Sequence, residues 1–299
     1  MNKVLLSFLL ALFSMIANAY VDYTTVDGIK YKYDTLTKQA EVTSNSYNQK
    51  SIVIPSTVII SSDTYTVTGI GDSAFSGCSS LTTITLPNSI TKIGDYVFEG
   101  CTGLTSITIP KSVTSIGWCT FRNCTGLTSM TIPYSVISIG GGTFSGCSNL
   151  KKVILNNNSM VSQSNSSSWD ISSIFGSQVN EYILGDSIKA IGSYTFANCK
   201  KLHSVVIPNS VVSIGRSAFE GCNSLTNVSI KDLGAWCNIL FAGDYSNPLY
   251  YAHHLYLNNV EVKELVIPES VFSINDYSFY SCDNLTSVTI PKNVTTIFL

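Results

Sequence analysis

The 299-residue sequence is poor in charged side chains. Only 12% of its residues are Asp, Glu, Lys or Arg, and the formal net charge at pH 7 is −2. A protein that binds nucleic acid needs clustered Lys and Arg to displace counterions from the phosphates, and docking on an anionic membrane needs a similar basic patch. The composition therefore argues against both kinds of partner.

The sequence also lacks the side chains of a catalytic or metal centre. It has three histidines, no Cys-x-x-Cys pair, no phosphate-binding P-loop and no Gly-x-Gly-x-x-Gly turn. A metal site needs several converging ligands, and a hydrolase needs a nucleophile with a base and an oxyanion hole. Gly185-Asp186-Ser187 is the nearest approach to a hydrolase block, and no such constellation accompanies it. We therefore expect no enzyme activity, no cofactor and no metal.

Long apolar runs are confined to the start of the chain. Lys3, the apolar run from Val4 to Ile16 and the small-residue site Ala17-Asn18-Ala19 have the pattern of a secretory signal peptide. This run is too short for an anchored transmembrane helix, and no second long run follows. We expect residues 1–19 to be removed before Tyr20, which leaves a mature chain with no transmembrane segment that is secreted or held at the cell surface.

An internal repeat is the dominant feature that the sequence does have. Phenylalanine recurs at intervals of 23 residues in two series, first at Phe75, Phe98, Phe121 and Phe144 and then at Phe196 and Phe219, with Cys three and Leu six residues behind each. An alternating apolar and polar run then follows, as in Ile107-Thr108-Ile109-Pro110. A period of this length with Leu-x-x-Ile-x-Ile spacing predicts a leucine-rich repeat solenoid.

The repeat predicts a mainly β solenoid of stacked coils of about 23 residues with short parallel strands. A strand this short buries its apolar face only by stacking on the next coil, about 4.8 Å away. Equivalent residues then form columns. We expect seven of the cysteines to form one column of buried, reduced thiols, because parallel side chains in register are badly aimed for a disulfide; a disulfide within the column is the less favoured alternative. Gly94, Gly117 and Gly140, each behind an Ile, are expected at turns with positive φ.

The chain divides into three parts and two insertions. Residues 1–19 form the signal peptide, residues 20–50 an N-terminal β-hairpin cap, and residues 51–299 the solenoid. The insertion near residues 156–170 is rich in Asn and Ser and is expected to be a surface loop. The insertion near residues 231–260 is rich in aromatic residues and ends in a predicted hairpin around Asn258-Asn259.

The repeat unit resembles that of a known family. Residues 112–133 and 210–230 match almost throughout the unit Ser-Val-Thr-Ser-Ile-Gly, Ala-Phe, Cys and Leu-Thr-Ser-Ile-Thr-Ile-Pro of the BspA-like leucine-rich repeat family. That family comprises secreted and cell-surface proteins, notably of the Bacteroides group. The resemblance implies a scaffold for adhesion to host proteins or neighbouring cells, and it supplies neither a ligand nor a catalytic motif.

We interpret the protein as a non-catalytic protein-binding or adhesion scaffold. The expected partner is a host or neighbouring-cell surface or matrix protein, or a glycan. A structural surface-layer or stalk component and a carbohydrate-binding accessory protein remain as alternatives. The candidate partner-binding residues lie on the outward strand face and in the second insertion: Ser106, Thr108, Ser129, Thr131, Trp236, Tyr250 and Tyr251. The alternative for the aromatic residues is a local mini-core under the insertion.

Overall fold

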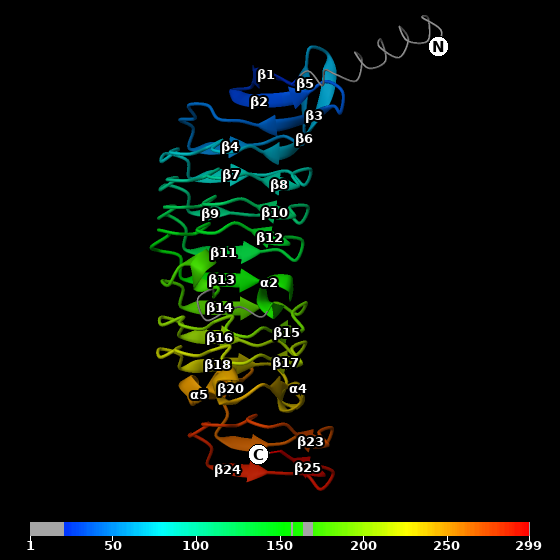
Figure 1. Ribbon diagram of the computed structural model, residues 1–299, viewed down its shortest axis with the longest axis vertical. Coiled ribbons are helices and arrows are strands. Elements are labelled where there is room, and N and C mark those ends of the chain that lie inside the picture. Colours follow the sequence, from blue (N-terminus) through cyan, green and yellow to red (C-terminus); the bar gives the residue numbers. More distant parts are fainter. Residues whose placement is uncertain (1–20, 157, 164–169, 299) are drawn as a thin grey trace, which may run out of the picture.

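Short parallel strands stack along one axis and form a β-solenoid with two long faces (Figure 1). The computed structural model describes residues 21–156, 158–163 and 170–298, so the predicted signal peptide lies outside the described residues. One face carries the main strands β4 (Ser51–Val53), β7 (Thr83–Thr85), β9 (Ser106–Ile107), β11 (Ser129–Ile132), β13 (Lys152–Leu155), β14 (Glu181–Leu184), β16 (Ser204–Val206), β18 (Asn227–Ile230), β20 (Leu255–Leu257), β22 (Glu264–Val266) and β24 (Ser287–Thr289). The predicted leucine-rich repeat solenoid is confirmed.

The second face carries shorter strands, which also pair in parallel from coil to coil. They are β8 (Lys92–Ile93), β10 (Ser115–Ile116), β12 (Ser138–Ile139), β15 (Ala190–Ile191), β17 (Ser213–Ile214), β19 (Leu240–Phe241), β23 (Ser273–Ile274) and β25 (Thr296–Ile297). The apolar residues of both faces point inward and form one continuous core along the axis.

The N-terminal coil is covered by antiparallel strands, as the predicted hairpin cap requires. Strands β1 (Val21–Val26), β2 (Ile29–Asp34) and β3 (Gln39–Val42) form a meander, and β3 pairs in parallel with β6 (Asp63–Ile70). Strand β6 also pairs antiparallel with β5 (Thr57–Ile60). The alternating pattern identified β2 and β3, whereas the β5–β6 hairpin within the degenerate first repeat was not expected.

A stack of buried aromatic rings runs along the solenoid interior. The centroids of Phe98 and Phe121 are 5.3 Å apart, and those of Phe121 and Phe144 are 5.1 Å apart, with interplanar angles of 12° and 9°. Phe175 takes the next place at 5.1 Å from Phe144, although an insertion separates the two in sequence. Each ring is completely buried, and the rings are stacked at about the spacing of neighbouring parallel strands.

The cysteine column is made of free, buried thiols. All nine cysteines of the sequence are free, as the register argument predicts. The Cys124 Sγ donates a hydrogen bond to the carbonyl oxygen of Phe98 at 3.0 Å, and the Cys147 Sγ donates to that of Phe121 at 3.0 Å. Burial raises the pKa of the Cys101 thiol to about 12 and that of Cys147 to about 11. Four thiols of the column, those of Cys101, Cys124, Cys147 and Cys222, therefore stay protonated and bond their coil to the one before it.

The glycines behind the second strand have a different role from the one predicted. Gly94, Gly117 and Gly140 are not among the residues with positive φ, so that expectation was wrong. A Cβ on Gly117 would lie 2.5 Å from the carbonyl carbon of Gly94 and 2.6 Å from the amide nitrogen of Asp95. These glycines are required because successive coils approach each other too closely for any side chain. The positive φ falls two residues later, as at Tyr96 and Cys119.

We expect Gly117→Ala to lower the free energy of unfolding by about 1–3 kcal/mol, because the new methyl group overlaps immovable backbone atoms. The matched control is Gly69→Ala, whose Cβ would meet only the Glu41 side chain, at 3.5 Å. Urea unfolding of both variants and the parent protein measures the difference. Equal midpoints for the two variants would show that the coils separate at little cost.

The first insertion is partly helical. Helix α2 (Asn158–Ser162) lies between β12 and β15 on the second face (Figure 1). The carbonyl oxygen of Val161 accepts hydrogen bonds from the Gly192 N–H at 2.7 Å and the Thr195 hydroxyl at 3.1 Å. A short helix α3 (Ser172–Phe175) then brings Phe175 to the core. The expectation of a loop was therefore wrong for residues 158–162, which replace a strand of the second face.

Candidate functional site

The four hydroxyl residues predicted on the main face are all exposed. Ser106 lies on β9, Thr108 directly follows it, and Ser129 and Thr131 lie on β11. Along the same rows, Ser129 pairs with Lys152 and Thr131 pairs with Ile154. Lys152 in turn forms an ion pair of 3.1 Å with Glu181 on β14. The face is thus a strip of small polar groups as far as β11. From β13 onward the same rows also carry charged and apolar side chains.

The second insertion begins with a helix that belongs to the core. Asp232 caps helix α4 (Leu233–Cys237) by accepting a hydrogen bond from the Ala235 N–H at 2.7 Å. Trp236 is only 1% exposed, and its indole N–H donates to the carbonyl oxygen of Ser278 at 2.8 Å. The prediction that Trp236 contacts a partner was therefore wrong, because its ring fills the interior and joins two successive coils.

Parallel pairing is interrupted after the second insertion. Strand β20 pairs with the short antiparallel strand β21 (Val260–Glu261), which confirms the hairpin at Asn258-Asn259, and the next ladder begins at β22. Among the described residues, no backbone ladder joins β20 to β22. Side-chain bonds cross this break: the Asn284 amide donates to a Glu261 carboxylate oxygen at 2.6 Å and lies 2.6 Å from His254 Nδ1.

Five tyrosines gather at one edge of the solenoid beside this break, and we call them the tyrosine cluster: Tyr245, Tyr250, Tyr251, Tyr277 and Tyr280. Tyr250 is the centre, with ring centroids 4.8 Å from Tyr245 and 4.9 Å from Tyr251. It also stacks on Tyr280 at 6.0 Å and 12°. Tyr245 is 40% exposed and Tyr280 is 44% exposed. The cluster therefore presents aromatic surface to solvent.

The tyrosine cluster is fixed by the elements that carry it. Tyr250 and Tyr251 lie on helix α5 (Leu249–Ala252), beside β20 (Figure 1). The Tyr251 hydroxyl accepts a hydrogen bond from the Gly221 N–H at 2.8 Å. The side chain of buried Asn247 donates to the carbonyl oxygen of Tyr277 in the following coil. These bonds hold tyrosines from different coils in one arrangement.

A charged groove adjoins the tyrosine cluster and shares Tyr245 with it. It has a volume of about 380 Å³, and its lining includes Arg216, Glu220 and Asp244. Hydrogen bonding with Tyr250 is the main cause that raises the pKa of the Tyr245 hydroxyl. An aromatic patch bordered by hydrogen-bonding and charged groups has the composition of a protein contact, in which Tyr and Arg are enriched.

Sequence reasoning found Tyr250 and Tyr251 but not Tyr280. The repeat could have identified Tyr280, because it directly follows Phe279 just as Arg122 directly follows Phe121. Arg122 is exposed, so the same position in the later coil is expected to be exposed as well. Among the described residues, no group of three or more His, Cys, Asp or Glu could hold a metal ion. Within that same part of the chain, no helix has the length and apolar character to cross a bilayer.

Comparison with known proteins identifies the repeat. The model of the BspA-type leucine-rich repeat region matches residues 68–183, 172–242 and 252–298. No curated protein shows significant sequence similarity to the chain.

Several solved structures are similar to the chain, among them the following three. A leucine-rich repeat protein from T. pallidum is 25% identical, with a TM-score of 0.45, over 77% of this chain and 90% of that one. A leucine-rich repeat protein from Bacteroides ovatus is 22% identical, with a TM-score of 0.39, over 92% and 78%. A leucine-rich cell surface protein from Faecalibacterium prausnitzii is 20% identical, with a TM-score of 0.25, over 89% and 94%.

Proposed function

This chain belongs to the BspA-type leucine-rich repeat family, and we propose that it is a non-catalytic binding scaffold that works outside the cell, secreted or at the cell surface. The proposed partner is a protein of a host or neighbouring cell surface or matrix. Export is supported by the signal-peptide pattern of residues 1–19. Repeat solenoids bind through extended faces and through the loops that interrupt the repeat.

The observation that carries this proposal is the solvent-exposed tyrosine cluster at the break in the repeat. Other coils carry small or charged residues at the place of Tyr280, such as Ser76 and Arg122, so the exposed ring at this place is not part of the repeat pattern. Tyr is one of the residues most enriched in the energetic centres of protein interfaces. The ring contacts described above fix the cluster, so little side-chain entropy is lost when it is covered.

The test begins with capture of a partner from host matrix and serum proteins by the purified protein, followed by a dissociation constant for the identified pair. We expect Tyr250→Ser and Tyr280→Ser each to weaken binding by at least about tenfold, because an anchor of an interface contributes about 2 kcal/mol or more. Tyr23→Ser is the matched control, because Tyr23 is 55% exposed and lies on β1, far along the axis (Figure 1).

These point substitutions are preferable to removal of residues 231–260, because Trp236 and Cys237 belong to the core and their loss would disturb folding. Unchanged affinity in both tyrosine variants would count against the cluster as the site. The strip formed by Ser106, Thr108, Ser129 and Thr131 would then be the next surface to test, by Thr108→Lys and Thr131→Lys.

A further inference from the structure

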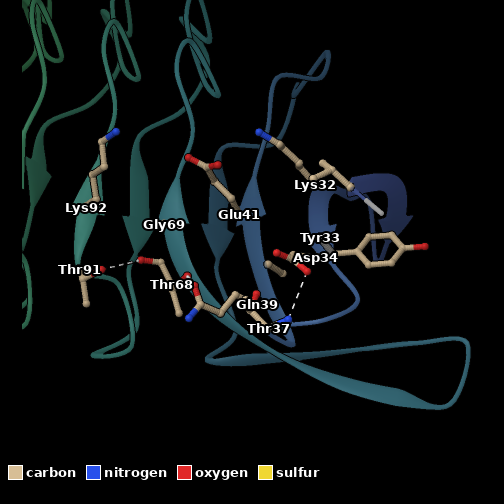
Figure 2. Close-up of a pocket in the computed structure, with 12 residues that line it drawn as sticks. Lys32, Tyr33, Asp34, Thr37, Gln39, Glu41, Thr68, Gly69, Thr91 and Lys92 are labelled. Carbon is tan, nitrogen blue, oxygen red and sulfur yellow. Dashed lines mark hydrogen bonds between the residues drawn. The ribbon is translucent and has the colours of Figure 1, made fainter. Parts of the chain in front are cut away.

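A second hollow lies at the other end of the molecule, on the outer side of the sheet where the cap joins the solenoid (Figure 2). We call it the cap pocket. It has a volume of about 410 Å³ and is lined by residues of β2, β3, β6 and β8. This volume lies within the range of small-molecule sites.

One row of outward-facing positions forms the middle of the cap pocket. Lys32 on β2 pairs with Glu41 on β3, Glu41 pairs with Gly69 on β6, and Gly69 pairs with Lys92 on β8. Farther along, Lys92 pairs with Ser115. Gly69 is therefore the one place in this stretch of the row without a side chain, and Figure 2 shows it between Glu41 and Lys92.

The fold does not require glycine at position 69. Its φ is not positive, and an added Cβ would meet only Glu41 side-chain atoms at 3.5 Å or more. Gly117, by contrast, faces backbone atoms at 2.5 Å. A glycine inside a strand weakens that strand, and it commonly marks a bulge or the close approach of a ligand.

A β-bulge lies directly beside this glycine. The pairing of β3 with β6 shifts between Ala40 and Glu41, so that Thr68 is passed over in the register. Bulges re-aim side chains and are over-represented next to functional sites. Here the shift places Glu41 opposite Gly69, where its carboxylate lies over the space that a side chain would fill.

The four charged side chains that line the pocket have no ion-pair partner among the described residues. The side chains of Lys32, Glu41 and Lys92 extend toward the same side of the sheet (Figure 2), and no ion pair among the described residues includes any of them. Asp34 is different, because its carboxylate accepts hydrogen bonds from the Leu36 N–H at 2.8 Å and the Thr37 N–H at 3.2 Å. Two ammonium groups and one carboxylate therefore face the hollow.

We propose that the cap pocket is a second binding site, distinct from the tyrosine cluster, and that it takes one acidic monosaccharide residue. The ammonium groups of Lys32 and Lys92 suit the sugar carboxylate, because hydrogen bonds between charged groups are the stronger ones. The Glu41 carboxylate accepts hydrogen bonds from sugar hydroxyls. The Gln39 amide also lines the pocket and supplies N–H donors, while the Thr91 hydroxyl, which donates to the Thr68 carbonyl oxygen at 3.2 Å, is available as an acceptor.

The test is a ligand-observed NMR titration of the purified protein at low salt with four probes: glucuronic acid, N-acetylneuraminic acid, glucose and acetate. We expect an acidic sugar to bind and the other two probes to bind at least about tenfold more weakly, because each lacks half of the recognised groups. Lys92→Gln and Gly69→Ser should weaken acidic-sugar binding by a similar factor. Lys111→Gln, an exposed lysine outside the pocket, should leave binding unchanged.

Three results would overturn the proposal: no binding of either acidic sugar, equal binding of glucose or acetate, or unchanged binding in Gly69→Ser. A thermal unfolding curve of Gly69→Ser that coincides with the parent shows that the substitution acts on the pocket. If Gly69→Ser is instead unstable, Lys32→Gln together with Lys92→Gln decides the outcome, because both lysines are exposed.

Discussion

At pH 10 the urea concentration that half-unfolds this protein is expected to fall well below its value at pH 7. The cause is the cysteine column, in which burial raises the pKa of Cys101 from 9.0 to about 12 and that of Cys147 from 9.0 to about 11. Cys237 and Cys282 are shifted in the same direction, to about 12 and about 11. Each of these thiols is held neutral by the fold.

The sign of the effect follows from which state of the chain, folded or unfolded, loses its thiol protons first as the pH rises. Below pH 9 the thiols are protonated in both states, so the stability from their neutral burial is fully present. Between pH 9 and about pH 11 the unfolded chain loses these protons while the folded chain keeps them, and the folded state therefore becomes less stable as the pH rises. At pH 10 the raised pKa of each thiol lowers the free energy of unfolding by roughly 1 kcal/mol. The thiols together therefore lower it by several kcal/mol.

The measurement is a series of urea titrations from pH 7 to pH 10.5 with a reducing agent present. Lys and Tyr ionisation also change over this range, so the control is the variant Cys101→Ala with Cys147→Ala, which has a lower stability at pH 7 but a shallower dependence on pH. A midpoint that stays constant up to pH 10.5, or a slope unchanged in the double variant, would contradict the account.

Phe121→Ala is expected to lower the free energy of unfolding by about 3–5 kcal/mol. The Phe121 ring is completely buried and stacks on two rings, Phe98 and Phe144. Its removal leaves a cavity that the neighbouring coils cannot close, because their spacing is set by the parallel ladders on both faces.

The matched control for Phe121 is another phenylalanine, Phe272, which is 65% exposed. Phe272→Ala should change the free energy of unfolding by less than about 0.5 kcal/mol, as is usual for surface positions. Chemical denaturation of both variants gives the comparison. A midpoint for Phe121→Ala equal to that of Phe272→Ala would falsify the coil register on which the columns depend.

The sequence predicts the regular coils well because every coil repeats the same environment. A single offset from each Phe fixes the Cys, the Leu and the alternating strand in the regular coils, whereas Phe175 takes its place in the stack with neither Cys three nor Leu six residues behind it. The glycines behind the second strand were placed correctly and explained wrongly. Glycine is needed there because the backbones of successive coils lie too close for a side chain, and a single repeat unit does not show that contact.

Residues 231–260 could not be read in the same way, because they occur once. Composition alone cannot separate an aromatic residue that fills a core from one that reaches the surface, and it grouped buried Trp236 with the half-buried Tyr250 and Tyr251. The local sequence does distinguish Trp236. Asp232 is a typical helix N-cap, and Leu233, Trp236 and Cys237 lie on one face of the helix that follows, which is the pattern of a buried helix face. Gly69 is the opposite case. Nothing in the sequence distinguishes it from a glycine that the backbone needs, and only the space beside its Cα shows that the fold would accept a side chain there.

The interrupted ladder between β20 and β22 has a mechanical consequence. Along most of the solenoid, force parallel to the axis is carried by the backbone hydrogen bonds of the parallel ladders, although no ladder among the described residues joins β9 to β11 or β12 to β15. The bonds across the junction after β20 include one backbone bond, from the Asn275 N–H to the Cys237 carbonyl oxygen, and side-chain bonds from Trp236, Asn247 and Asn284. We expect this junction to be among the first to open under tension, with residues 262–298 separating as one block. The tyrosine cluster spans this weak point, with Tyr250 on one side and Tyr280 on the other, so a partner bound across both would act as a clamp on the joint.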